Sequence, residues 1–207
     1  MNKSKIAVIE GKWFKNSNIS VRGLFDLISD IQFDSPNEYH YEMFNNGDAL
    51  KEIIKRLAAT NNIHNIYIAA HGSESGIVGS SGQSISTTTL ANIIKSTNTQ
   101  RGKLHSIYFG SCSFGHTKNL EKLLLSAQGD QIRWLAGYTK EIDFVKSTML
   151  DAIFWNEYLQ LRKSRSLGKI EMACSKVTEQ AEGLVKELGF KVIAYDGRKS
   201  NPVCELI

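Results

Sequence analysis

The fold of this chain is decided by two short segments, IYIAAHG at residues 66–72 and IYFGSCSFG at residues 107–115. Each begins with an apolar run rich in β-branched and aromatic residues, which is typical of a strand buried on both faces of a parallel sheet. The first run delivers His71 to its carboxyl end, and the second delivers Cys112. In open parallel sheets, ligands and chemistry lie beyond the carboxyl ends of the strands. If the two strands are neighbours, His71 and Cys112 face each other across one crevice as a base and its nucleophile.

Strand-like and helix-like patterns alternate along the rest of the chain. We expect strands at 5–10, 38–44, 66–70, 104–110, 132–138 and 190–195, a hairpin at 76–80 and 83–86, and helices at 21–31, 48–59, 87–94, 118–125, 143–161 and 175–188. Such alternation predicts a mostly parallel sheet covered on both faces. We therefore expect an α/β fold with a six-stranded sheet. Residues 1–207 are interpreted as one domain, with a core at 5–161 and a C-terminal helix–strand unit at 170–196.

Composition limits the class of protein. The 207 residues are 42% hydrophobic and 22% charged, which is typical of a globular domain and argues against disorder. No apolar run reaches the roughly 18 residues that span a bilayer, and the N-terminus lacks a signal-peptide pattern. We therefore expect a cytoplasmic protein with no membrane partner. The net charge of +4 is modest, and the basic cluster at 162–165 with Lys169 is interpreted as a solvated linker, so no nucleic-acid partner is expected.

The three cysteines are Cys112, Cys174 and Cys204. They are far apart, and no pair has the spacing of a zinc site. We expect free thiols, no metal and no cofactor. Cys174 and Cys204 are interpreted as small hydrophobic side chains.

The two opening segments resemble the paired signatures of the caspase-like (clan CD) cysteine peptidases, a superfamily that includes caspases, legumain, separase and the bacterial CHAT proteases. Its pattern is an apolar block ending in His-Gly, followed by a second block ending in a small residue and Cys, often as Cys-x-x-Gly. Here these are residues 68–72 and 110–115. The hairpin and helix between them resemble the CHAT type most. The resemblance covers residues 5–161 and implies a caspase-like three-layer sandwich.

The resemblance implies a role for each motif residue. Cys112 would be the nucleophile, and His71 would act as its base and as an acid toward the leaving amine. The backbone N–H groups of Gly72 and Cys112 would form the oxyanion hole. Glycine at position 72 would leave room for the substrate carbonyl. A helix starting near Ser113 would stabilise the thiolate. In the family a backbone carbonyl often serves as the third member, and His116 is a rival base.

Three charged residues near the expected strand ends are candidates for binding the substrate side chain. Glu10 ends the first strand and Asp143 follows the fifth, where CHAT-like and separase-like enzymes place an Asp that reads Arg or Lys. Asp143 is equally placed to cap the helix that follows it. Arg22 resembles the caspase arginine that reads an aspartate, or is a solvated residue at a helix start. We favour a basic residue before the scissile bond, with Arg preferred over Lys.

The expected function is that of a cysteine endopeptidase acting on a protein substrate in a regulated proteolytic or defence pathway. No cleavable linker separates Gly115 from Ile132, so a separate activator or sensor protein is expected. Two alternatives stay open: a catalytically silent caspase-like interaction module, and a thiol hydrolase acting on a small molecule.

Overall fold

The computed structural model describes residues 5–14, 16, 18–36, 38–97, 103–127, 132–161, 167–198 and 202–207. Its central feature is a seven-stranded sheet in the order β10-β9-β8-β7-β3-β1-β2. The strands are β1 (Lys5–Glu10), β2 (His40–Met43), β3 (Ile63–Ala69), β7 (Ser106–Gly110), β8 (Trp134–Tyr138), β9 (Phe190–Tyr195) and β10 (Val203–Glu205). From β2 to β8 neighbouring strands are parallel, and β9 and β10 pair in the antiparallel sense.

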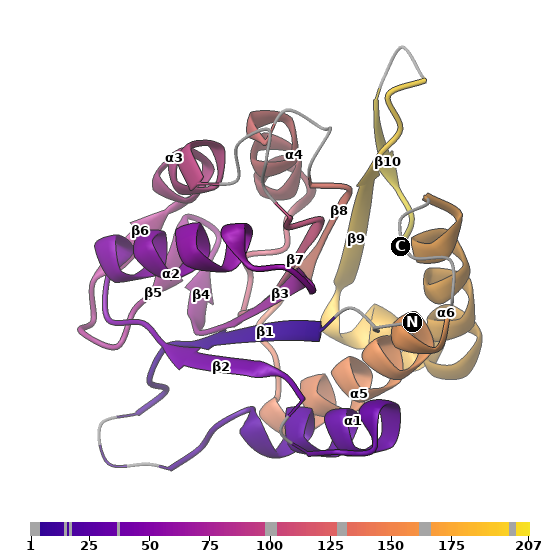
Figure 1. The fold of residues 1–207 in the computed structure, drawn as a ribbon. Coiled ribbons are helices and arrows are strands. Elements are labelled where there is room, and N and C mark those ends of the chain that lie inside the picture. The colour runs from indigo at the N-terminus through magenta and orange to yellow at the C-terminus, as the bar shows by residue number, and fades with distance from the viewer. Residues whose placement is uncertain are drawn as a thin grey trace.

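Helices cover both faces of this sheet, as Figure 1 shows. Helices α2 (Gly47–Ala59), α3 (Thr87–Thr97) and α4 (Thr117–Ser126) pack on one face, and α1 (Arg22–Phe33), α5 (Phe144–Gln160) and α6 (Leu167–Leu188) pack on the other. Alternate residues of each strand point to opposite faces, so Ile66 and Ile68 join the first layer while Tyr67 joins the second. The α/β three-layer sandwich expected from the sequence is confirmed.

The sequence prediction missed two features of the sheets. Strand β10, which is only three residues long, was not predicted. With it the sheet has seven strands instead of the six expected. The predicted hairpin is part of a second, three-stranded sheet of β4 (His71–Ser73), β5 (Gly76–Val78) and β6 (Ser84–Ser86). Strand β4 begins at His71, so the chain leaves one sheet and enters the other at the predicted base.

The interpretation of Lys169 as part of a solvated linker is wrong. Helix α6 begins at Leu167, eight residues earlier than the predicted start at Ser175. Lys169 is only 8% exposed, and its Nζ lies 4.1 Å from the centroid of the Tyr158 ring. Burial lowers the pKa of Lys169 to about 8. The other members of that basic cluster, residues 162–165, lie outside the described residues.

Candidate active site

The register of the parallel strands brings His71 and Cys112 to the same level. Ala69 of β3 pairs with Gly110 of β7, and each candidate residue comes two positions later in its own chain segment. Glu10 at the end of β1 pairs with the same Ala69. The carboxyl ends of three neighbouring strands therefore meet where the sequence predicts the chemistry.

Gly72 lies directly against the backbone of Cys112. A Cβ atom on Gly72 would lie 2.4 Å from the Cys112 carbonyl oxygen, 2.8 Å from Ser111 Cβ and 3.2 Å from the Cys112 nitrogen. Only glycine fits at this position, because real Cβ atoms do not approach other atoms so closely. The space that we expected to receive a substrate carbonyl is filled by the Cys112 backbone instead. This contact fixes the two motifs side by side.

His71 and Cys112 line one cavity of about 140 Å³. Most of its wall is apolar or aromatic, and none of its lining residues is Asp, Glu, Lys or Arg. The full lining is Trp13, Phe14, Ile19, Val21, Tyr67, His71, Gly110, Cys112, Ile142, Phe144, Ser147 and Thr148.

The imidazole of His71 is oriented by a backbone carbonyl. Its Nε2 lies 2.5 Å from the carbonyl oxygen of Trp13. A carbonyl oxygen only accepts hydrogen bonds, so Nε2 carries the hydrogen and, in the neutral ring, Nδ1 keeps its lone pair. The rings of Trp13 and Phe14 meet the imidazole edge-on, with centroids 5.4 and 5.3 Å away. His71 is thus held in one tautomer and one orientation, with Nδ1 available as a base.

Glu10 holds the loop that carries Trp13. It is 1% exposed, and its Oε1 accepts hydrogen bonds from Trp13 Nε1 at 2.7 Å and Val21 N at 3.0 Å. Its Oε2 accepts from the hydroxyls of Ser20 and Tyr41, both at 2.6 Å. Glu10 does not line the cavity. Its two oxygens accept four hydrogen bonds from the protein itself, so the carboxylate stabilises the local structure. Its predicted contact with a substrate side chain does not fit this geometry, and a positioning role does.

The loop after Cys112 is tied to the end of β8. Ser113 N donates to Lys140 O at 2.9 Å, and Gly115 N donates to Tyr138 O at 2.7 Å. Ser113 adopts a left-handed conformation with φ of 54°. Helix α4 begins at Thr117, close to the predicted start at 118, so the condition that a helix start near Ser113 for its N-terminus to stabilise the thiolate is not met. Within the described part of the chain, no acceptor takes the Cys112 N–H, which leaves it available as an oxyanion donor.

His116, the rival base, lies beside Glu74 and not in the cavity of Cys112. Its Nε2 lies 3.7 Å from Glu74 Oε1 in the turn between β4 and β5, and the side chain does not line the cavity. The geometry therefore favours His71 as the partner of Cys112.

The other two candidates for substrate binding also lie outside the cavity lining. Asp143 is the N-cap of α5, and its side chain accepts from Lys146 N at 2.8 Å. Arg22 is exposed at the first position of α1, with its guanidinium 4.9 Å from the ring centroid of Tyr41. Of the charged candidates, the structure brings none into the cavity beside Cys112 and His71.

The thiols differ in their surroundings. All three cysteines carry thiols, with Cys112 and Cys204 partly exposed and Cys174 buried. Burial raises the pKa of Cys174 far above its usual range, so this thiol stays protonated. No group of three or more His, Cys, Asp or Glu side chains suited to a metal ion occurs among the described residues.

Sequence reasoning missed the buried polar cluster next to the cavity. Tyr67, Tyr108 and Tyr138 come from three adjacent strands, and their hydroxyls donate to the carboxylate of Asp151 on α5. A lone acidic residue on the apolar face of a helix, between Leu150 and Phe154, was the available signal. No sequence pattern could predict the role of the Trp13 carbonyl, because every residue has a backbone carbonyl and the residue type does not reveal which one meets His71.

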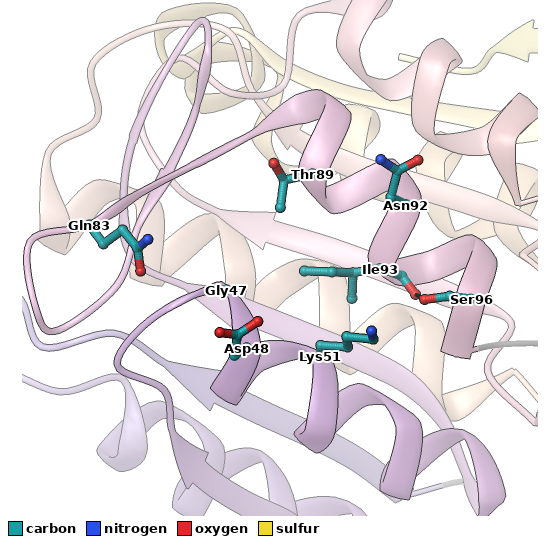
Figure 2. A pocket seen from close by; sticks show the side chains of 8 residues that line it. All are labelled: Gly47, Asp48, Lys51, Gln83, Thr89, Asn92, Ile93 and Ser96. Carbon is teal, nitrogen blue, oxygen red and sulfur yellow. Dashed lines mark hydrogen bonds between the residues drawn. The ribbon is translucent and has the colours of Figure 1, made fainter.

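A second pocket lies away from Cys112, between the first turn of α2 and α3 (Figure 2). Its volume is about 450 Å³, and it shares no lining residue with the cavity of His71. Figure 2 shows Asp48 and Lys51 on α2 opposite Thr89, Asn92 and Ser96 on α3. Its lining contains no cysteine and no histidine, so it offers no pair like Cys112 and His71.

One of three comparisons with known proteins bears on this architecture. Residues 39–127, less than half of the chain, match a family model described as "Domain of unknown function (DUF8616)". No curated protein matches the sequence. The fold is similar to the crystal structure of "the Arg specific cysteine proteinase gingipain R (RGPB)", with a TM-score of 0.55 and 15% sequence identity.

That similarity covers 90% of this chain and 44% of the other, so this chain spans less than half the length of that proteinase. At this identity the likeness establishes the fold, which is the caspase-like fold expected from the two motifs. No helix in the described part of the chain is long and apolar enough to cross a membrane.

Proposed function

We propose that this protein is a cysteine peptidase of the caspase-like type, with Cys112 as nucleophile and His71 as base. One observation carries the proposal: His71, oriented by the Trp13 carbonyl, lines the same cavity as Cys112, while Gly72 packs against the Cys112 backbone. A thiol beside a base that is itself oriented by a third group is the arrangement of an activated nucleophile.

The proposed reaction runs in two stages. His71 Nδ1 takes the thiol proton, and the sulfur attacks the peptide carbonyl while the backbone N–H groups of Cys112 and Gly72 stabilise the oxyanion. His71 then gives its proton to the leaving amine, which leaves an acyl-enzyme thioester. Water, deprotonated by His71, hydrolyses the thioester and restores the thiol. The Trp13 carbonyl accepts from Nε2 throughout and stabilises the imidazolium.

A peptide substrate suits the cavity better than a whole small molecule. Pockets for drug-sized ligands measure about 300–1,000 Å³, whereas this cavity of about 140 Å³ suits one amino-acid side chain. This favours a peptidase over the alternative of a small-molecule thiol hydrolase.

We also propose, from the resemblance of the motifs, the CHAT-type affiliation, a cytoplasmic location and control by a separate activator or sensor protein in a proteolytic or defence pathway. Preference for a basic residue before the scissile bond is part of the same proposal, although Glu10 and Asp143 do not line the cavity.

A fluorogenic peptide library tests the proposal. We expect Cys112→Ala and His71→Ala each to lower kcat/KM by about a thousandfold or more, and the double variant to be little worse, because members of one catalytic unit are not additive. Cys204→Ala, which removes a partly exposed thiol elsewhere, is the matched control and should keep full activity.

Loss of activity in His116→Ala with retention in His71→Ala would show that the base is misassigned. A folded protein that cleaves no peptide, and whose Cys112 reacts no faster than Cys204 with electrophiles, would support the catalytically silent alternative.

A further inference from the structure

A buried carboxylate with an unusual set of partners lies behind the cavity. Asp151 is 2% exposed. Its Oδ2 accepts from the Tyr67 hydroxyl at 2.6 Å, and its Oδ1 accepts from the hydroxyls of Tyr108 and Tyr138. Burial raises the pKa of Tyr67, Tyr108 and Tyr138 well above 10, so all three keep their hydrogens. Three fixed donors therefore converge on one carboxylate.

Asp151 has no cationic partner within the described ranges. None of the ion pairs there includes it, although buried charges are usually paired with an opposite charge. Burial raises its pKa to about 6, with the tyrosine hydroxyls opposing the shift. Near pH 8 Asp151 is thus a buried negative charge that a cation could still neutralise.

Tyr67 connects this charge to the cavity. Because its hydrogen points to Asp151, its oxygen offers only lone pairs in other directions. Tyr67 and Gly110 both line the cavity of Cys112, and a Cβ on Gly110 would lie 2.0 Å from Tyr67 Oη. The hydroxyl thus occupies the space that any side chain at position 110 would need. The cavity presents a hydrogen-bond acceptor with a negative charge behind it.

The rest of the cavity suits an aliphatic stem. Trp13, Ile142 and Phe144 are among its walls, and no Lys or Arg side chain competes for the acceptor. A carboxylate entering this cavity would meet the second negative charge of Asp151 and no Lys or Arg to pair with. A long side chain with an apolar stem and a cationic tip matches each of these features.

We propose that this cavity binds the side chain preceding the scissile bond, and that Tyr67, held by Asp151, makes it select lysine. The inference rests on the proposed peptidase function and assigns the specificity role of Glu10 and Asp143 to different residues.

The hydroxyls of Ser147 and Thr148, which donate to the Phe144 carbonyl, also line the cavity, but Tyr67 is the acceptor with the Asp151 charge behind it. This localised negative potential suits the compact ammonium of Lys, whereas the guanidinium of Arg spreads its charge over five N–H donors in a fixed fork. The expected order is Lys, then Arg, then neutral side chains, then Glu.

Peptidyl acyloxymethyl ketones that alkylate Cys112 test this order, with the rate read by intact-protein mass spectrometry at pH 8. Lysine and norleucine are the matched pair, because norleucine keeps the aliphatic stem and lacks the ammonium. The wild type should react about 10- to 100-fold faster with the lysine probe, the range expected for one hydrogen bond to a charged group.

Tyr67→Phe should bring the lysine-to-norleucine ratio close to one. Tyr108→Phe is the control, because it removes another donor to Asp151 but does not line the cavity; its ratio should stay near that of the wild type. Equal loss of selectivity in both variants, or a wild type that prefers norleucine, would overturn the proposal.

Asp151 acts through Tyr67 as a positioning residue, so its test is a pH profile. The wild-type ratio should fall as pH drops through about 6, where Asp151 gains a proton. Asp151→Asn should show a low ratio with no such step. His71 and Glu10 are present in both proteins, so only the step that Asp151→Asn removes is assigned to Asp151, and the three tyrosines do not titrate in this range.

The outcomes separate the two proposals. Fast labelling of Cys112 by the norleucine probe, with no gain from lysine, leaves the peptidase standing and removes the specificity assignment. No labelling by any probe in a protein whose Cys112 still reacts with iodoacetamide removes both.

Discussion

Glu10 and Asp151 are both buried carboxylates, 1% and 2% exposed, but they serve different parts of the molecule. The donors to Glu10 come from the loop after β1, from the start of α1 and from β2. The donors to Asp151 are three tyrosines on adjacent strands of the sheet. One carboxylate orders a loop, and the other orders side chains on a rigid sheet.

The difference shows two ways in which a buried carboxylate can influence the candidate active site. Glu10 accepts from Trp13 Nε1, and the Trp13 carbonyl accepts from His71, so Glu10 would act on the proposed base. Asp151 orients the hydroxyl of Tyr67 in the cavity, so it would act on the side chain that we propose to bind there. Loss of Glu10 should impair every substrate alike, whereas loss of Asp151 should change selectivity.

The largest expected effect is that of Glu10→Ala. Four donors lose their acceptor, and each unpaired buried donor costs about 1–3 kcal/mol, so the free energy of unfolding should fall by about 3 kcal/mol or more. Urea unfolding measures the loss. Glu42→Ala on β2, which removes a partly exposed carboxylate paired with Arg56, should cost less than about 1 kcal/mol. Similar costs for both variants would contradict the role of Glu10.

The next effect is a pH dependence of stability from Asp151. Burial raises the pKa of Asp151 to about 6 in the folded protein, from the ordinary value of 3.8. Between these pH values the folded state holds a proton that the unfolded state has lost, so stability falls as pH rises. The stability of the wild type relative to Asp151→Asn should therefore decrease by about 2 kcal/mol between pH 4 and pH 7. Chemical unfolding at several pH values measures this, and a difference independent of pH would exclude it.

Gly110→Ala should have a smaller effect on stability and a clear effect on selectivity. Its Cβ would lie 2.0 Å from Tyr67 Oη, and such overpacking typically costs about 1–3 kcal/mol. Displacing the hydroxyl should also lower the preference for lysine over norleucine. Gly183→Ala in α6, where a Cβ meets nothing within 4 Å, is the matched control and should stabilise by roughly 0.5–1 kcal/mol. A stable Gly110→Ala variant with unchanged selectivity would show that the Tyr67 hydroxyl does not determine which side chain the cavity binds.

The sequence could predict local features of the site but not the partners of its buried carboxylates. The strands that end beside the site and the cap at Asp143 follow from local patterns. The level positions of His71 and Cys112 follow from parallel register once β3 and β7 are neighbours, which the sequence left as a condition. The partners of Glu10 and Asp151 come from elements up to 84 residues away, as in the Tyr67–Asp151 bond. A local pattern carries no information on such contacts, so Glu10 was interpreted as a substrate ligand and Asp151 was missed.

The smallest expected effect is that of Asp143→Ala. Loss of the N-cap bond to Lys146 N should cost about 1 kcal/mol in thermal or chemical unfolding. The ratio of labelling rates for lysine and norleucine probes should not change, because Asp143 does not line the cavity. A large fall in that ratio would restore the original assignment of Asp143 as the residue that reads a basic side chain.

The pairing of Cys112 with His71 is tested most directly by iodoacetamide, which needs neither a known substrate nor an activator. Peptide mapping by mass spectrometry gives the alkylation rate of each cysteine in the folded protein near pH 7. We predict that Cys112 reacts at least about tenfold faster than the partly exposed Cys204, since proton transfer to His71 supplies the reactive thiolate, and that His71→Ala removes this advantage. Equal rates at Cys112 and Cys204, unchanged by His71→Ala, would contradict the catalytic pair.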